Sequence, residues 1–315
     1  MTEKTTIGRG RQASQYFQGT RLGRLRTAAS IVAAALGVMA AATACGGSPS
    51  HPAPSPSATA SGGASALPSP APTASSEAST VLVYFMRGSY LGTAHRQVAA
   101  TTAIARAAMG ELLSGPTALE SQAGLDSQIP LGSKVLGLSV SGHVATVNLS
   151  SEFSNSGSPS SALARLAQVT FTITHLPGVS RVQFQFQGLV LTHLLGAPVR
   201  LDEPVQRSDF DEVMPPIFVE LPAPGDTLGA SLRVEGSADV FEAQFQIELR
   251  DSGGNLVLSE PVTATSGSGQ RGGFDAAFVY RTNYPGLGQL TAFDVSAKDG
   301  SRIDTVSIPV VLTAS

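Results

Sequence analysis

The clearest hydrophobic pattern along the chain runs through residues 101–113. Ile104, Ala108 and Leu112 recur every fourth residue with further apolar side chains beside them, so one broad face of a helix is apolar. Gly115 follows, and glycine commonly ends helices because it accepts the left-handed conformation after the last turn. The pattern therefore predicts a helix that packs one face against the rest of the fold.

Two alternating segments come next, at residues 135–140 and 144–149. Apolar side chains occupy every second position in each segment, which is the period of half-buried strands. Only Ser141-Gly142 and one further residue separate the two segments, so they are predicted to form a tight β-hairpin.

Three more segments complete a first predicted domain, residues 80–197. Residues 81–86 form a continuous apolar run, which suits a central strand. A second amphipathic helix is predicted over 161–173 with Ser161 as its cap, and residues 181–187 alternate as a strand. The order β-α-β-β-α-β predicts a small α+β domain with two helices on one face of its sheet.

The rest of the chain, residues 213–315, contains short apolar runs separated by glycine, proline and aspartate. Seven strands are predicted at 217–220, 231–235, 241–249, 256–258, 274–280, 290–297 and 305–312. Short strands at this spacing predict an all-β, immunoglobulin-like sandwich. In the third run, Phe241, Phe245 and Ile247 are expected to point inward because they share one phase of the alternation.

The N-terminal residues 1–44 have the parts of an export signal. Arg21, Arg24 and Arg26 precede an apolar run at 31–42, which is shorter than the roughly 20 residues of a membrane span. The segment is therefore interpreted as a cleaved signal peptide.

Cys45 is the sole cysteine of the chain, so it cannot belong to an intramolecular disulfide framework. Its position after Ala42-Thr43-Ala44 resembles the lipobox of bacterial lipoproteins, in which the cysteine receives diacylglycerol and acyl chains such as palmitate and becomes the new N-terminus. A lipobox usually has Leu where Ala42 stands, and the same three residues fit an ordinary A-x-A cleavage site. Lipid attachment at Cys45 is favoured, with plain secretion as the alternative.

Two segments lie outside the predicted domains. Residues 45–79 consist almost entirely of Ser, Pro, Ala, Gly and Thr, a composition typical of a disordered linker. Residues 198–212 are rich in acidic side chains and are interpreted as a connector. Because such a connector need not bury much surface, the two domains are expected to unfold independently.

The charge balance changes when the N-terminal segment is set aside. The chain has 20 Lys and Arg against 23 Asp and Glu, but six of the basic residues and one acidic residue precede Cys45. The remainder has 14 basic and 22 acidic side chains, a net charge of −8. Nucleic acid is not an expected partner, because its binding requires Lys and Arg to neutralise phosphates.

Two motifs resemble ligand-binding sites, but structural roles explain both of them better. Residues 267–272 have the G-x-G-x-x-G spacing, but a predicted strand follows where a nucleotide site needs a helix N-terminus. Asp209 and Asp211 could hint at calcium, but the other oxygen ligands of a calcium loop are missing. No cofactor and no metal are expected.

The first domain contains four histidines, at His95, His143, His175 and His193. A Ser/His/Asp site could form among them, but nothing in their spacing requires one. His143 adjoins the hairpin turn and His175 a helix C-terminus, where a cation is favourable, so structural roles are preferred. No catalytic residue is predicted, and the protein is not expected to be an enzyme.

The first domain resembles the GerMN domain of spore-germination and sporulation proteins in the stretches TTAIARAAMGELLSGP, GLDSQIPLGSKVLGLSVSGHVATVNLSSEF and LARLAQVTFTITHLPGVSRVQFQFQG. The second resembles the Gmad-type immunoglobulin-like domain of bacterial spore-germination proteins in PIFVELPAPGDTL, LRVEGSADVFEAQFQIEL, TATSGSGQRGGF and SAKDGSRIDTVSIPVVL. The resemblance implies non-catalytic domains, the first similar in build to ring-forming modules of sporulation complexes. It offers no catalytic residue to this chain.

Together these observations predict an exported envelope protein, held by lipid on Cys45 at the extracytoplasmic face of a bacterial cell membrane. It is expected to act as a binding or scaffold module for envelope proteins or cell-wall polymer, in sporulation, germination or wall-associated assemblies, with oligomerisation left open. The alternatives are an extracytoplasmic solute- or wall-polymer-binding protein and a wall-active hydrolase. A hydrolase needs a polar pocket with an acid of shifted pKa, and a solute binder needs a deep apolar cleft.

Overall fold

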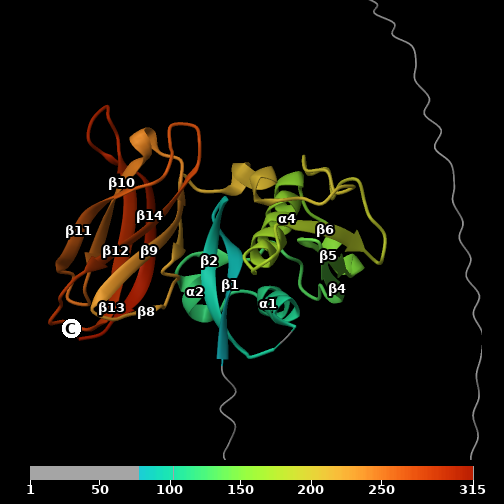
Figure 1. The fold of residues 1–315 in the computed structure, drawn as a ribbon, viewed down its shortest axis with the longest axis horizontal. Helices are drawn as coiled ribbons and strands as arrows, with labels where there is room; N and C mark the ends of the chain where they lie inside the picture. The colour runs from blue at the N-terminus through green and yellow to red at the C-terminus, as the bar shows by residue number, and fades with distance from the viewer. Residues whose placement is uncertain (1–77, 102, 315) are drawn as a thin grey trace, which may run out of the picture. The chain divides into compact units, whose positions relative to one another are not determined.

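The structure is a computed structural model that describes residues 78–101 and 103–314. It consists of a mixed α/β domain followed by an all-β sandwich, which confirms the predicted fold class (Figure 1). The predicted signal peptide, Cys45 and nearly all of the predicted linker lie outside the described residues.

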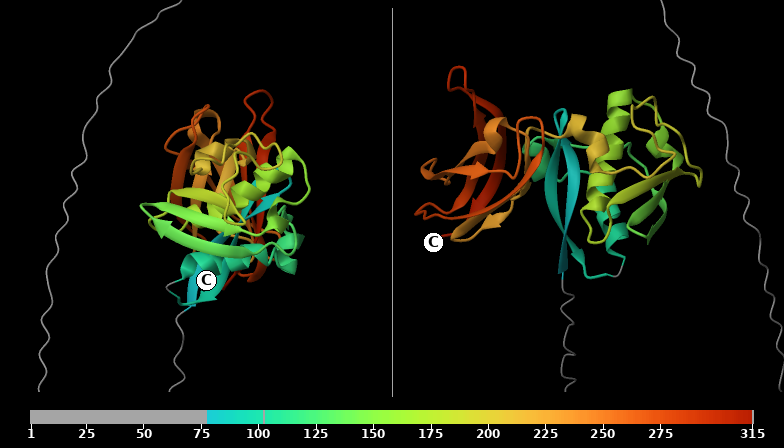
Figure 2. Two further views of the ribbon diagram at one scale, coloured as in Figure 1. Left: turned by 90° about the vertical axis from the view of Figure 1, so that its right-hand side faces the viewer. Right: turned by 45° about the horizontal axis from the view of Figure 1, so that its top comes forward.

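A long hairpin begins the first domain. β1 (Ala78–Arg87) pairs antiparallel with β2 (Tyr90–Ala99) over ten residue pairs, and Figure 2 shows the two strands as one twisted ribbon. β1 also pairs with the short β3 (Leu125–Asp126), so it is the central strand that its apolar run predicts. The hydrophobic pattern does not predict β2, because His95 and its polar neighbours interrupt the alternation.

A second sheet has the order β4-β5-β6, with β4 at Val135–Ser141, β5 at Val144–Leu149 and β6 at Arg181–Phe186. The predicted hairpin β4–β5 is confirmed, and its turn places Gly142 and His143 at φ of 55° and 67°. β5 and β6 run parallel. The expectation of a single sheet with both helices on one face is wrong. The strands divide into two three-stranded sheets, and the two helices contact strands of both sheets.

Those helices are α1 (Ile104–Leu113) and α4 (Pro159–Thr174), each of which contacts β1 and the second sheet (Figure 1). The short helices α2 (Ala118–Gln122) and α3 (Ser151–Ser154) lie between the predicted elements. β1, α1, β4, β5, α4 and β6 reproduce the predicted order, with β2, β3, α2 and α3 added.

The cap of α4 differs from the prediction. Ser158, not Ser161, is the N-cap residue, and its hydroxyl accepts a hydrogen bond from the Ser161 backbone N–H at 3.1 Å. The Ser161 hydroxyl accepts in return from the Ser158 N–H at 2.9 Å, so the two serines form a reciprocal capping box. Ser161 therefore stands one turn inside the helix that it is predicted to cap, because Pro159 occupies the first helical position.

The sandwich contains a five-stranded sheet of order β11-β10-β13-β14-β8 and a three-stranded sheet of order β12-β9-β7. The strands are β7 (Ile217–Leu221), β8 (Thr227–Leu228), β9 (Ser231–Ala238), β10 (Gln244–Arg250), β11 (Leu256–Thr263), β12 (Gly272–Val279), β13 (Gly286–Val295) and β14 (Arg302–Leu312). Each of the seven predicted runs overlaps one strand, and β8 is the addition. Phe245 and Ile247 are buried as expected.

One position in that sandwich is a correction. Phe241 is 65 % exposed, because residues 241–243 form a short 3-10 helix, η2 (Phe241–Ala243), and not the start of a strand. Glu242 has a φ of 54°, which breaks the extended backbone that alternation requires. The alternation therefore starts at Gln244, where β10 begins.

Residues 198–212 do not form a solvated connector. Leu201, Val205 and Phe210 are buried in the core of the first domain, and the 3-10 helix η1 (Arg207–Val213) contacts α4. Acidic neighbours such as Asp202 face solvent, which explains why the composition suggests a connector. The expectation that this segment buries little surface is wrong, because Val205 pairs with Val182 of β6 and η1 contacts α4.

Candidate functional site

Cys45, the residue to which the sequence assigns lipid attachment, lies outside the described residues, as does Ala42-Thr43-Ala44. Within residues 78–101 and 103–314, none of the helices has the length and apolar character needed to cross a membrane. The described residues contain a different candidate site, which consists of polar side chains where the first domain meets the sandwich.

Tyr84 is the residue on which this junction depends. It is fully buried in β1, and its ring packs against Phe171 of α4 and Phe218 of β7, with ring centroids 5.4 and 6.0 Å away. These tilted ring contacts fix the direction of the phenol. The hydroxyl is thereby held at the border between the two domains.

Three polar side chains meet that hydroxyl, and with Tyr84 we call them the junction cluster: His175, Arg207 and Glu220. The Tyr84 hydroxyl donates to the Glu220 carboxylate and lies 3.2 Å from Nδ1 of His175. Arg207 donates from Nη1 to Glu220 Oε1 and from Nη2 to the Tyr84 oxygen, both at 2.9 Å. The cluster joins β1, the end of α4, η1 and β7.

The charges of the junction cluster follow from burial and proximity. Burial raises the pKa of Tyr84 well above its ordinary value, and the nearby Glu220 carboxylate adds to the rise. Burial opposes the charge on Arg207, but Tyr84 and Glu220 outweigh it and raise the pKa of Arg207. Burial also lowers the pKa of His175. At neutral pH the cluster therefore consists of a neutral phenol, a neutral imidazole and an arginine–carboxylate ion pair.

A second set of contacts joins β2 to the sandwich. His95 Nδ1 lies 2.7 Å from Asp226 Oδ2, and the same oxygen accepts from the Ala223 backbone N–H at 2.8 Å. The Thr93 hydroxyl donates to the Val219 carbonyl at 3.4 Å. Both strands of the β1–β2 hairpin thus reach the second domain.

The remaining candidate histidines lie elsewhere. His143 Nδ1 is 2.9 Å from the Gly178 carbonyl oxygen, which ties the hairpin turn to the loop after α4. His193 is exposed in the segment after β6. The structure brings His95 and His175 to the junction, where their partners are Asp226 and Tyr84 and not a serine.

The two ligand motifs have structural explanations. Asp209 Oδ2 accepts from the Gln206 N–H at 2.8 Å and so caps η1, and no cluster of three potential metal-binding side chains occurs among the described residues. The glycine-rich loop leads directly into β12, as predicted. A side chain at Gly267 would lie 2.7 Å from the backbone of Ala243, so glycine serves close packing of two loops there.

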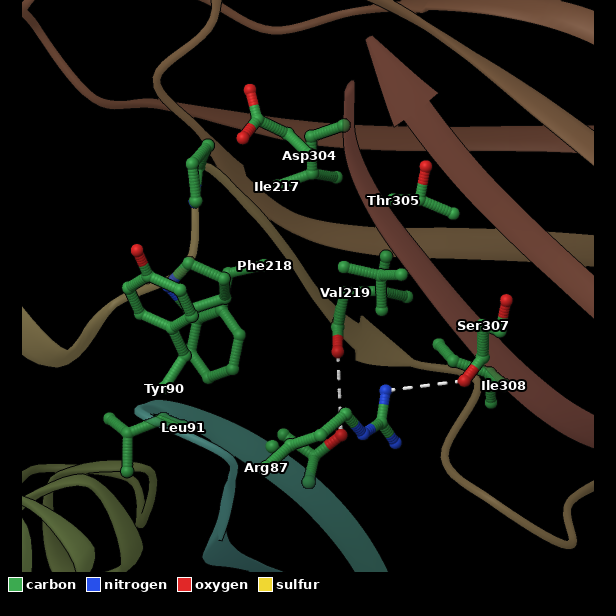
Figure 3. Close-up of a pocket in the computed structure, with 15 residues that line it drawn as sticks. Arg87, Tyr90, Leu91, Ile217, Phe218, Val219, Asp304, Thr305, Ser307 and Ile308 are labelled. Carbon is green, nitrogen blue, oxygen red and sulfur yellow. Dashed lines mark hydrogen bonds between the residues drawn. The ribbon is translucent and has the colours of Figure 1, made fainter. Parts of the chain in front are cut away.

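A pocket of about 230 Å³ lies beside the junction cluster, between the β1–β2 hairpin, β7 and β14 (Figure 3). Leu91, Phe218 and Ile308 contribute apolar surface. Arg87 and Asp304 provide charged groups, and the Arg87 guanidinium donates to the Ser307 carbonyl at 3.3 Å. The sequence gives no sign of this pocket, because its walls come from segments more than 200 residues apart.

Solved structures provide three comparisons. The first GerMN domain of the sporulation protein GerM from Bacillus subtilis has 17 % identity and a TM-score of 0.36, covering 41 % of this chain and 98 % of that one. The tandem GerMN domains of the same protein have 14 % identity and a TM-score of 0.36, covering 58 % and 59 %. A candidate lipoprotein from Clostridium perfringens has 19 % identity and a TM-score of 0.32, covering 44 % and 93 %.

Family models give a direct assignment, whereas no curated protein matches the chain. Residues 82–192 match Germane, described as sporulation and spore germination. Residues 216–301 match Gmad2, described as an immunoglobulin-like domain of bacterial spore germination. The first domain is therefore assigned to the Germane domains of sporulation and spore germination, and the sandwich to the immunoglobulin-like domains of bacterial spore germination.

Proposed function

We propose that the protein is a non-catalytic binding or scaffold module of the bacterial envelope, anchored by lipid on Cys45 at the extracytoplasmic face of the cell membrane. One observation carries this proposal: two domain families of sporulation and spore germination follow each other on one chain, after a segment with the pattern of an export signal. An exported pair of such domains, tethered at one end, presents its surfaces to envelope proteins or cell-wall polymer.

The junction supports a scaffold because it joins the two domains through paired charges. Arg207 and Tyr84 both donate to Glu220, and His95 contacts Asp226. In these contacts both carboxylates hold the two domains together, which is the role that a scaffold requires of them.

The anchor is tested with Cys45→Ser in a bacterial host that processes lipoproteins, with Ser48→Ala as a matched control three residues away. The wild-type protein and Ser48→Ala should fractionate with membranes, and the intact mass of the mature protein should include acyl groups. Cys45→Ser should appear in the medium or remain as an unprocessed precursor. A wild-type N-terminus free of acyl groups would replace lipid anchoring with plain secretion.

The scaffold role is tested by crosslinking in intact cells, followed by purification of the full-length protein from membranes. The expected result is the recovery of the same envelope protein or wall fragment from independent preparations. A companion incubation with purified cell wall should release no soluble fragments. Release of such fragments by the wild type would instead establish the hydrolase alternative.

A further inference from the structure

Arg87, the last residue of β1, has few partners for its side chain. Among the described residues its guanidinium makes one hydrogen bond, from Nη1 to the Ser307 carbonyl at 3.3 Å, and its Nε is buried without a partner. Within the described ranges, no carboxylate forms an ion pair with it. Arg96 by contrast pairs with Glu120, and Arg165, whose Nε is likewise buried without a partner, donates from its Nη atoms to three backbone carbonyls.

Arg87 is half-buried, so part of its guanidinium is removed from water without an ionic partner among the described residues. Desolvation without compensation opposes the charged form. Burial accordingly lowers the pKa of Arg87, although the group remains a cation. The Arg87 side chain lines the pocket beside the junction cluster, where an anion from solution would meet its positive charge (Figure 3).

The pocket has the size and walls for a small organic molecule. Its volume of about 230 Å³ exceeds the roughly 150 Å³ of an apolar cavity that accepts benzene. Leu91, Phe218 and Ile308 provide apolar walls. Gly92 also lines the pocket, and a Cβ there would lie 2.6 Å from Leu125 Cδ2, so glycine lets Leu125 pack beside the hairpin at this wall.

Asp304 limits the charge of the ligand. Figure 3 shows it across the pocket from Arg87, on β14. Burial and the nearby Asp294 raise the pKa of Asp304, so a second anionic group at that end would meet an unfavourable field. One cationic end and one acidic end favour a ligand with a single negative charge.

We propose that this pocket binds a small organic monocarboxylate, with the Arg87 guanidinium on the carboxylate and the apolar walls on the carbon body. Arginine suits this role because its planar fork matches a carboxylate with two parallel hydrogen bonds. The proposal goes beyond the scaffold role and does not depend on the lipid at Cys45.

Titration calorimetry on the purified full chain tests the proposal with acetate, butyrate and benzoate as probes and with the corresponding neutral amides as controls. At least one carboxylate should bind saturably with one site, and its amide should bind about tenfold or more weakly, because a charge-assisted hydrogen bond is lost. Absence of saturable binding by all three carboxylates, or equal binding of acid and amide, would refute the proposal.

Variants then locate the site. Arg87→Gln should weaken the binding of the best probe about tenfold or more, whereas Arg281→Gln, at an exposed position of the sandwich, should leave it unchanged. Arg87→Lys keeps the charge but loses the fork, so it should fall between the wild type and Arg87→Gln. If Arg87→Gln does not fold, NMR of the wild type takes the place of this variant. The probe should then protect the Nε–H signal of Arg87. Binding that neither Arg87 variant alters, or an NMR signal that the probe leaves unmoved, would place the carboxylate elsewhere and overturn the assignment.

Discussion

The hydroxyl group of Tyr84 in β1 donates a hydrogen bond to Glu220 in β7, although 136 residues separate the two along the chain. The Arg207 guanidinium completes the arrangement, since its carbon lies 4.7 Å from the ring centroid of Phe171 and 5.2 Å from that of Tyr84. The strand at the centre of the first domain thus also holds the sandwich. Polar networks of this kind stabilise only while every member keeps its partners.

Tyr84→Phe should lower the free energy of unfolding by about 1–3 kcal/mol, because Glu220 and Arg207 each lose a partner in a largely buried place. Urea denaturation of the two proteins measures the difference. Tyr284→Phe is the control, since Tyr284 is 56 % exposed and should change the stability by less than about 0.5 kcal/mol. Equal stability of wild type and Tyr84→Phe would show that the hydroxyl contributes nothing.

The two domains should unfold together, in contrast to the independence that the sequence suggests. Phe184 and Phe245 are both almost fully buried, so either change to Ala should cost about 3–5 kcal/mol. Calorimetry should show a single transition that each substitution lowers as a whole, because the junction couples the cores. Two separate transitions, each sensitive to one substitution, would mean that the junction is weaker than the cores it joins.

Weakening the junction should separate those transitions. The combined substitutions Glu220→Ala and His95→Ala remove one partner from each of the two sets of contacts across the domains. The expected calorimetric trace has a broadened or divided transition. Glu235→Ala, at an exposed carboxylate of the sandwich, is the matched control and should leave one transition.

Phe241 and Phe245 provide a matched pair within one segment of the sandwich. Phe245→Ala should be strongly destabilising, whereas Phe241→Ala, at a side chain that is 65 % exposed, should change the stability by less than about 0.5 kcal/mol. Denaturation of both variants measures their stability and shows whether the Phe241 side chain is exposed, as in the structure, or points inward, as strict alternation predicts. Comparable losses of stability from both substitutions would mean that Phe241 packs on the inner face.

Alkaline pH should destabilise the protein through Tyr84. Its pKa in the folded state is raised, chiefly by burial, so the unfolded chain releases this proton first as the pH rises. The stabilisation is therefore complete below the ordinary tyrosine pKa of about 10 and is lost as the pH rises towards the folded value. The stability advantage of wild type over Tyr84→Phe should shrink above about pH 10.

Denaturation at several alkaline pH values measures that advantage. Tyr280, whose pKa burial also raises, is present in both proteins and cancels in the comparison. An advantage that stays constant through this pH range would contradict a neutral, buried phenol at position 84.

Local patterns predicted much of the fold. The apolar run at 81–86 identifies a central strand because sheet neighbours and helices surround β1, and the alternation at Phe184 and Phe186 identifies their inner face because both are buried. β2 has no such signal, since part of its polar surface is directed at the sandwich, where His95 and Thr93 bond. Alternation along one strand carries no information about a partner that is distant in the chain.

The junction and the pocket could not be predicted for the same reason. Tyr84 is the one residue with a polar tip in an otherwise apolar run, and that isolated hydroxyl is the only local sign of a buried partner. Glu220 and Arg87 both stand at strand ends, where charged residues usually face water. Only the arrangement of distant segments in the fold shows that Glu220 forms an ion pair with Arg207, whereas Arg87 has no carboxylate partner among the described residues.

The ten-residue pairing of β1 with β2 has a mechanical consequence. The described fold begins at Ala78, so a force transmitted along the chain from its N-terminal side enters the folded body through β1. Because β1 also carries Tyr84, part of such a load passes directly from this strand to Glu220 of the sandwich, and the rest passes to β2 through the hairpin. Tension on the tether is therefore borne by the hairpin and the junction cluster together, so the contact between the domains also serves as a mechanical joint.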